Sequence, residues 1–233
     1  SLGADPTQGC GRAVWENNGD LNKYGTTMGL MLLPFWTDGC IGSMEGLFFE
    51  AAGTTPYHFI TAAAMSKQSS NPVRELRYDN NDAAKGIAYM RALGVKYFMG
   101  FTPEAVTAAS AQEGLVKVAQ SGPWVIFRVS ESDLVVPLTV QPVVVSMASG
   151  DPRERWLEIG TSWFQHSDEW SALPADAGPR EWQRIDTRID LARREGEPGA
   201  SGRRVDIVTP DQAIEPVALP PVVVSNVVQG QSD

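Results

Sequence analysis

The chain has 233 residues, of which 42% are hydrophobic and 20% charged, and its formal net charge is −9. This length and apolar content are sufficient for one large domain, or a domain with an appendage, around a buried core. No stretch concentrates Lys and Arg, which argues against a nucleic-acid partner, and none reaches the roughly 18 apolar residues of a membrane-spanning helix. The first 60 residues hold six acids and two bases. This excess suits a solvated face, a neutral or cationic ligand, or a bound metal.

The N-terminal third is expected to be mostly loop, with a short strand at 12–15. The stretch 30–35 is apolar and short, which predicts a buried strand leading into a turn punctuated by glycines. The sequence HFITAAAMS at 58–66 predicts a helix. A polar connection follows at 67–82.

Helix start and stop signals are clearest in the middle of the chain. Asp82 or Asn81 can cap a helix over 83–93, and Gly94 can end it. A strand is expected over 95–101. Thr102 and Pro103 then form the cap and first turn of another helix that continues to about residue 110.

The second half of the chain predicts alternating short strands and helices. The expected strands are 115–119, 124–129, 134–138, 142–147, 204–208 and 222–228. The expected helices are 151–165 and 179–194, with a flexible link at 196–204.

This order of elements predicts an α/β fold, with α+β as the alternative, in which helices flank a mixed sheet. We expect a core domain over residues 1–148. Residues 149–233 are expected to form a looser appendage of a helical segment, a flexible link and β-strands, incomplete at its C-terminus. The abrupt ends of the sequence suggest a piece of a longer protein.

The chain contains two cysteines, Cys10 and Cys40, both in loops flanked by glycines. Neither belongs to a CxxC pattern, and only two histidines are present, so a Cys- or His-based metal site is not expected. We predict a disulfide and therefore an oxidising compartment. The alternative is a pair of free buried thiols in a cytosolic protein. No cofactor is expected.

An unusual concentration of acids falls in a segment rich in glycine. Asp38, Glu45 and Glu50 lie among small and apolar residues. They could supply a general acid and base, as in glycosyl chemistry, or oxygen ligands for a divalent cation. The alternative is a structural role in helix capping or salt bridges. The arginines available for such bridges are Arg12, Arg74 and Arg77.

Two further side chains belong to the candidate site. Trp36 lies beside the acidic turn and could stack on a sugar ring. His58 follows Pro56 and Tyr57 at an expected helix start, where a lone histidine is more often structural. The surroundings of Ser43 lack a GxSxG motif, and the chain has neither a P-loop nor a GxGxxG motif. The other conspicuous tryptophans, spaced seven residues apart, are expected in a core or an interface; they are Trp156, Trp163 and Trp170.

Three stretches of the sequence resemble a known type of protein. They are PFWTDGCIGSMEGLFFEAAGTTPYHF at 34–59, LGVKYFMGFTPEA at 93–105 and GLVKVAQSGPWVIFRVSESDLVVPL at 114–138. They resemble the soluble extracytoplasmic portion of multi-pass membrane proteins of the YfhO-like and actinobacterial cell-envelope type, which are GT-C-like glycosyltransferases. The likeness covers residues 9–147 well and the remainder loosely.

The resemblance implies a parent enzyme that transfers a sugar from a polyprenyl-phosphate donor at the extracytoplasmic face of the cell membrane. Its implied partners are a glycan or glycolipid head group and the protein's own transmembrane domain. It assigns no catalytic residue to this chain. The expected ligand-binding residues are Trp36, Asp38, Glu45, Glu50 and His58. The alternatives are a non-catalytic carbohydrate-binding or cell-wall interaction domain, and a self-sufficient hydrolase that uses Asp38 with Glu45 or Glu50.

Overall fold

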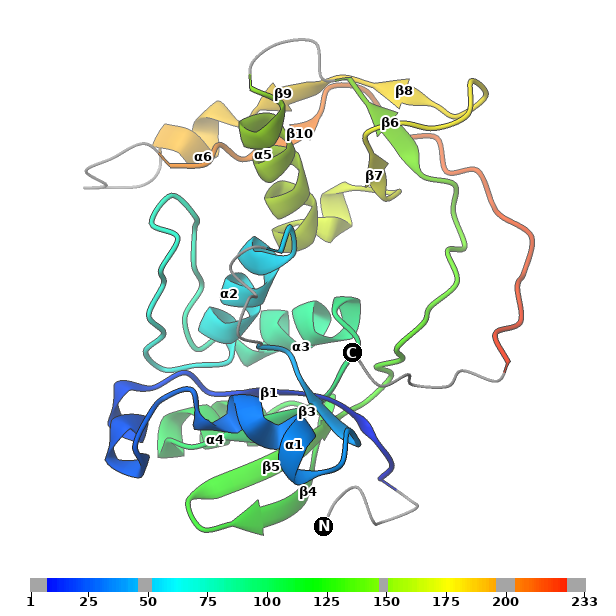
Figure 1. Cartoon of the computed structure of the whole chain (residues 1–233). Helices are drawn as coiled ribbons and strands as arrows, with labels where there is room; N and C mark the ends of the chain where they lie inside the picture. The colour runs from blue at the N-terminus through cyan, green and yellow to red at the C-terminus, as the bar shows by residue number, and fades with distance from the viewer. Residues whose placement is uncertain (1–7, 46–51, 147–150, 196–203, 226–233) are drawn as a thin grey trace. The chain divides into compact units, whose positions relative to one another are not determined.

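The computed structural model describes residues 8–45, 52–146, 151–195 and 204–225 (Figure 1). Its contacts divide the chain into two compact units. The first extends to Val135, except for Arg74–Arg77, which belong with Val136–Ser225 in the second. The sequence-based domain boundary lay at residue 148. A mixed five-stranded sheet, two smaller sheets and flanking helices make this an α/β fold, as predicted.

The sheet of the first unit combines parallel and antiparallel strands. Strands β2, β1 and β3 run parallel, whereas β5 runs antiparallel to both of its neighbours, β3 and β4. From one edge to the other the order is β2 (Ile41–Ser43), β1 (Gly11–Trp15), β3 (Val95–Gly100), β5 (Trp124–Val129) and β4 (Leu115–Ser121). The predicted strands at 12–15, 95–101, 115–119 and 124–129 are therefore confirmed.

Two helices of the first unit begin at the caps that the sequence predicts. The Asp82 side chain accepts a hydrogen bond from Lys85 N at the start of α3 (Ala83–Ala92), and Gly94 after it has φ +61°. Thr102 caps α4 (Pro103–Ser110) in the same way, by accepting from Ala105 N. The helix expected at 58–66 is α2 (Thr55–Ala64). The caps of α3 and α4 each accept from a backbone N–H that the helix start leaves unpaired, whereas α2 begins without a side-chain cap.

The sheet of the first unit has apolar residues on both faces. One face forms the larger cluster, in which Val95, Phe98 and Phe127 pack with residues of α3 and α4. The other face forms a smaller cluster with Tyr97 and Ile126. Tyr97 and Phe98 are neighbours on β3 but belong to different clusters. The strand alternation sends the two side chains to opposite faces.

The expected strand at 30–35 is wrong. Residues Gly29–Leu32 form a 3-10 helix, η3, and Leu33–Trp36 form the short helix α1. Pro34 lies in the first turn of α1, where its missing N–H costs nothing, whereas in a central strand it would remove a ladder hydrogen bond. Leu33 of α1 packs against the smaller cluster of the sheet.

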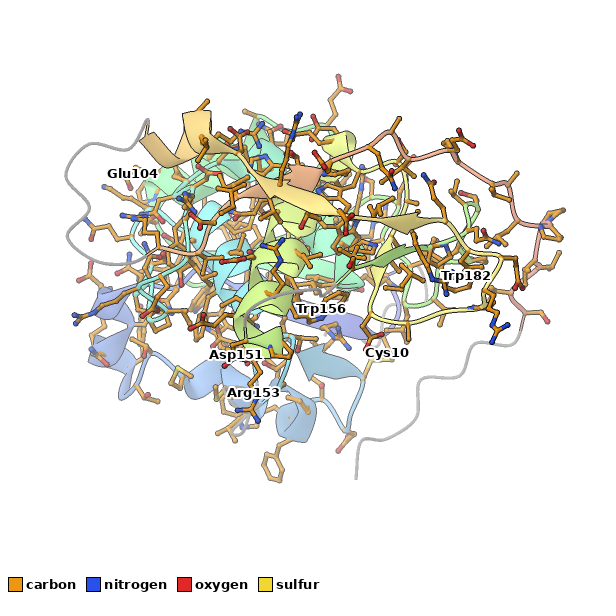
Figure 2. The ribbon with its side chains drawn as sticks, turned by 90° about the horizontal axis from the view of Figure 1, so that it is seen from above. Cys10, Glu104, Asp151, Arg153, Trp156 and Trp182 are labelled. Carbon is orange, nitrogen blue, oxygen red and sulfur yellow. A yellow bond between two sulfur atoms is a disulfide. The ribbon has the colours of Figure 1, made fainter. Side chains whose placement is uncertain are left out.

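The second unit contains the long helix α5 (Pro152–Gln165), confirming the helix predicted at 151–165. Figure 2 shows Trp156 on this helix, with Asp151 and Arg153 at its beginning. Trp170 is buried in the core of this unit, and Trp156 and Trp163 pack against that core. Trp170 is therefore a core residue, and Trp156 and Trp163 are partly buried against the same core, in agreement with the expectation of a core or an interface.

Short strands complete the second unit. Strand β6 (Val143–Val145) lies between β7 (Pro174–Ala175) and β8 (Arg184–Ile185) in a parallel sheet. Strand β9 (Thr187–Ile189) pairs antiparallel with β10 (Val208–Pro210). The short helices are η2 (Gly19–Tyr24) in the first unit, and η5 (Ser167–Glu169) and α6 (Leu191–Glu195) in the second.

Several expectations in the second half of the sequence are wrong. Residues 134–138 do not form a strand; Pro137 cannot donate to a ladder, and Val136 is 67% exposed. Most of 179–194 is not helical, because it contributes to β8 and β9. The strand expected at 204–208 begins only at Val208, and residues 222–225 have no regular structure. Residues 226–228 of the last expected strand lie outside the described residues. The same is true of residues 196–203 in the expected link.

Each helix in the described part of the chain is too short or too polar to cross a membrane.

Candidate functional site

A disulfide joins the beginnings of two parallel strands. Cys10 and Cys40 are bonded, with their Cα atoms 4.6 Å apart, directly before β1 and β2. Cys10 is labelled in Figure 2. Gly11 N also donates to Cys40 O at 3.0 Å, so the covalent bond and the strand pairing support each other. The predicted disulfide is confirmed, and it is consistent with an oxidising, extracytoplasmic location.

Buried carboxylates mark the opposite edge of the same strands. Parallel strands have their carboxyl ends at one edge, and open α/β sheets bind ligands outside that edge. Glu16 follows β1 directly, and Glu45 comes two residues after β2. Glu16 is 0% exposed and Glu45 is 3% exposed. A buried carboxylate is costly unless hydrogen bonds compensate it, so the partners of each decide its role.

Glu16 has donors on both of its oxygens. Its Oε2 accepts from Phe101 N at 2.8 Å and from Thr102 N at 2.7 Å, and its Oε1 accepts from Thr102 Oγ1 at 2.6 Å. These donors lie between β3 and α4. Glu16 therefore joins the end of β1 to the start of α4, where the helix dipole favours a negative charge. This arrangement indicates a structural carboxylate.

Of the two carboxylate oxygens of Glu45, one has a hydrogen-bond partner in the described part of the chain. Its Oε1 lies 3.0 Å from Nε2 of His58, and both side chains are buried. An ionised carboxylate only accepts, so His58 donates from Nε2. Glu45 N is held by the Ser43 hydroxyl at 3.0 Å. Oε2 is also buried, and no group in the described part of the chain hydrogen-bonds to it. Leaving such an acceptor unpaired costs about 1–3 kcal/mol.

The pairing of Glu45 with His58 depends on α2. His58 is in the first turns of this helix, and its ring meets that of Phe59 edge-on at a centroid distance of 5.5 Å. The neighbouring Tyr57 is also largely removed from water, and burial raises the pKa of its hydroxyl. The residues after β2 and the beginning of α2 thus bury one carboxylate and one imidazole together, away from water.

The other predicted site residues are not gathered around this pair. Trp36 is 57% exposed at the end of α1, and Asp38 is exposed in the following turn with φ +49°. Both precede β2, whereas Glu45 follows it, so the strand separates them. Glu50 lies outside the described residues. The structure therefore brings together Glu45 and His58 among the predicted residues.

Two of the three arginines proposed as structural partners of the acidic segment donate hydrogen bonds to backbone carbonyl groups. Arg12 Nη1 donates to Leu93 O at 2.7 Å, and Arg77 donates to Val205 O. Glu45 is paired with a histidine instead of an arginine. Sequence reasoning also missed Glu16, although a glutamate directly after the apolar strand GRAVW could have signalled a buried carboxylate.

The second unit has a cavity of about 850 Å³. Its polar lining residues include Glu169, Arg188, Asp190, Asp211 and Gln212. Arg193 pairs with Glu169 and, at 3.3 Å, with Asp190, and these carboxylates raise the pKa of its guanidinium. Two of the three acids are therefore neutralised from within the chain. Among the described residues, no three His, Cys, Asp or Glu side chains are grouped as metal ligands.

Comparison of the chain with protein-family models, curated proteins and solved structures returned no significant match. The motif resemblance described above therefore remains a hypothesis about family and function.

Proposed function

We propose that this chain is an extracytoplasmic domain that binds the hydroxyl groups of a glycan or glycolipid head group through Glu45, held by His58. The observation that carries the proposal is the buried carboxylate whose second oxygen has no hydrogen-bond partner in the described part of the chain. Sugar hydroxyls are donors of the kind this acceptor lacks. The location at the carboxyl edge of parallel strands supports the same role.

The wider setting we propose is a membrane-bound glycosyltransferase that acts on polyprenyl-phosphate-linked sugars during cell-envelope synthesis. The motif that resembles such proteins at 34–59 contains both Glu45 and His58. The disulfide supports an extracytoplasmic location. In this setting the domain positions the glycan or supports the protein's own transmembrane domain, which carries the catalytic step.

Access to the site imposes a condition on the proposal. Glu45 is 3% exposed and His58 is 4% exposed, so a ligand reaches the carboxylate only if this edge of the sheet rearranges. Ligand binding should therefore change the amide exchange of residues 43–45 and of the first turn of α2, in addition to their chemical shifts.

The test is a titration of the chain with arabinan and mannan fragments, followed by NMR. We expect shifts at Glu45 and His58, and we expect Glu45→Gln to weaken binding at least about tenfold, because a charge-assisted hydrogen bond contributes about 1.5–3 kcal/mol. The matched control is Glu104→Gln, which neutralises an exposed carboxylate of the same unit. Absence of shifts at Glu45 with every fragment would contradict the proposal.

The runner-up is a non-catalytic carbohydrate-binding domain of a membrane protein that is not a transferase. The same carboxylate site supports it, so glycan binding alone does not separate the two. Transfer from a polyprenyl-phosphate sugar by the membrane-bound parent would favour the transferase. A parent that binds glycan without transfer would favour the binding domain.

A further inference from the structure

An apolar surface is exposed on the helical segment that replaces the expected strand. Between Lys23 and Asp38 the sequence contains fourteen consecutive uncharged residues. Within this stretch Leu32 is 52% exposed, Phe35 is 78% exposed and Trp36 is 57% exposed. The three residues have helical spacings of three and four, which bring their side chains to one face. We call this set the Leu32–Phe35–Trp36 face.

The segment that carries the Leu32–Phe35–Trp36 face is anchored to the sheet by packing and hydrogen bonds. Leu33, between its members, packs on the sheet. The Thr37 hydroxyl donates to Leu33 O at 2.7 Å and accepts from Ile41 N at 2.9 Å. The disulfide at Cys40 fixes the following residues. The exposed side chains therefore belong to η3 and α1, a short helical segment that is anchored to the sheet.

The size of the face argues against a self-association surface. Side chains of this kind have about 150–250 Å² each, so the exposed fractions leave about 400 Å² for the whole face. A stable protein interface buries about 800 Å² on each partner. The face supplies about half of that area. A bilayer imposes no such minimum, because each inserted side chain gains independently.

The chemistry of the face matches the interfacial zone of a bilayer. Tryptophan is enriched there because its ring is apolar and its N–H is polar, and phenylalanine and leucine enter the acyl region beneath. No charged side chain lies between Tyr24 and Thr37, so insertion of the three face residues desolvates no charge of their own. It also means that attraction to anionic lipids makes little contribution, all the more so for a chain of net charge −9.

We propose that the Leu32–Phe35–Trp36 face inserts into the interfacial zone of a lipid bilayer. The proposal rests on the membrane location within the proposed function and specifies the element that makes the contact. Because η3 and α1 precede β2 and Glu45 follows it, the element that enters the lipid is not the one that carries the carboxylate site.

The test uses the whole disulfide-bonded chain and vesicles of phosphatidylcholine, with and without phosphatidylglycerol. We expect binding to both, with little dependence on salt. The double change Phe35→Ala and Trp36→Ala should weaken partitioning by about tenfold or more. Val116→Ala, which trims a residue of β4 that is 42% exposed, is the matched control and should leave it unchanged.

A second readout locates the contact. The structure describes all seven tryptophans, and Trp36 is the one that is exposed. Brominated lipids should therefore quench mainly Trp36, and Trp36→Phe should remove most of the quenching while leaving vesicle binding largely intact. Quenching that persists in Trp36→Phe would overturn the assignment.

Three other outcomes would overturn the proposal. They are failure of the wild-type chain to bind either vesicle, binding that requires phosphatidylglycerol and disappears in salt, and a wild-type dimer that dissociates in the double variant. Failure of the glycan proposal is distinguishable, because Glu45→Gln should leave vesicle binding unchanged. Conversely, the Phe35 and Trp36 changes should leave glycan binding unchanged.

Discussion

Glu16 offers the sharpest test of how the carboxyl edge of the sheet is built. The side chain is fully buried and accepts three hydrogen bonds from Phe101 and Thr102. Glu16→Ala removes all three and leaves two backbone N–H groups without their acceptor. Each unsatisfied donor costs about 1–3 kcal/mol, so for two donors we expect a loss of about 2–6 kcal/mol in the free energy of unfolding.

Glu16→Gln gives a graded comparison. Glutamine retains one acceptor oxygen but directs an NH₂ group toward donors, and we expect a loss of about 2–3 kcal/mol. A domain with a total stability of about 5–15 kcal/mol should tolerate this change and remain folded. The matched control is Glu104→Gln, which alters an exposed glutamate of the same unit.

The assay is urea unfolding monitored by circular dichroism, combined with amide exchange at Phe101 and Thr102. A double-mutant cycle with Thr102→Val isolates the coupling, which should lie between about 0.5 and 3 kcal/mol. Thr102→Val also removes the cap of α4, so the cycle is needed to separate the two effects. If Glu16→Gln stays within about 0.5 kcal/mol of the wild type, the hydrogen-bonded carboxylate does not stabilise this edge and the reasoning is refuted.

Two further predictions concern the first unit. Replacing Cys10 and Cys40 together with serine should lower the free energy of unfolding by about 3–4 kcal/mol, given their sequence separation of 30; alkylation without reduction should modify neither cysteine, and two modified thiols in native, oxidised protein would contradict the bond. The hydrogen bond from Lys67 lowers the pKa of Glu104, so Lys67→Ala should return that pKa toward its ordinary value in an NMR titration. Because the pKa of Glu104 is depressed, the small stabilisation by the pair is present above the ordinary glutamate pKa of about 4.3 and is lost as the pH falls through the lowered value; an unchanged pKa in the variant would show that Lys67 does not cause the shift.

The two edges of the parallel strands have different roles in this arrangement. The amino edge carries the disulfide and, beside it, the exposed Leu32–Phe35–Trp36 face. The carboxyl edge carries the buried Glu16 and the Glu45–His58 pair. Mutations can therefore test the proposed lipid contact and the proposed glycan site independently.

Local sequence determined the elements whose ends carry their own hydrogen-bonding signals. Asp82 and Gly94 delimit α3, and Thr102 with Pro103 starts α4, because each residue satisfies or tolerates a backbone condition within a few positions. The disulfide was also accessible from the sequence, since two glycine-flanked cysteines leave one possible pairing.

Tertiary structure alone decided the segments where local preferences conflict. The apolar stretch 30–35 suits either a buried strand or a helix, and periodicity cannot separate the two over so few residues. The alternating Ile185, Thr187 and Ile189 became strands because partners were available in β6 and β10. Strand propensity is realised only when a neighbouring strand accepts the hydrogen bonds.

The candidate site likewise combines residues that the sequence identified with a contact that only the tertiary structure determined. Sequence singled out Glu45 and His58 separately, but their contact depends on how α2 packs at the end of β2. Sequence also grouped Trp36 and Asp38 with Glu45, because they are close along the chain. A strand of three residues lies between them, and an extended strand advances about 3.3 Å per residue. Trp36 and Asp38 are therefore close to Glu45 in sequence but separated from it by β2. Only the fold could determine that Glu45 is the carboxylate buried beside a histidine.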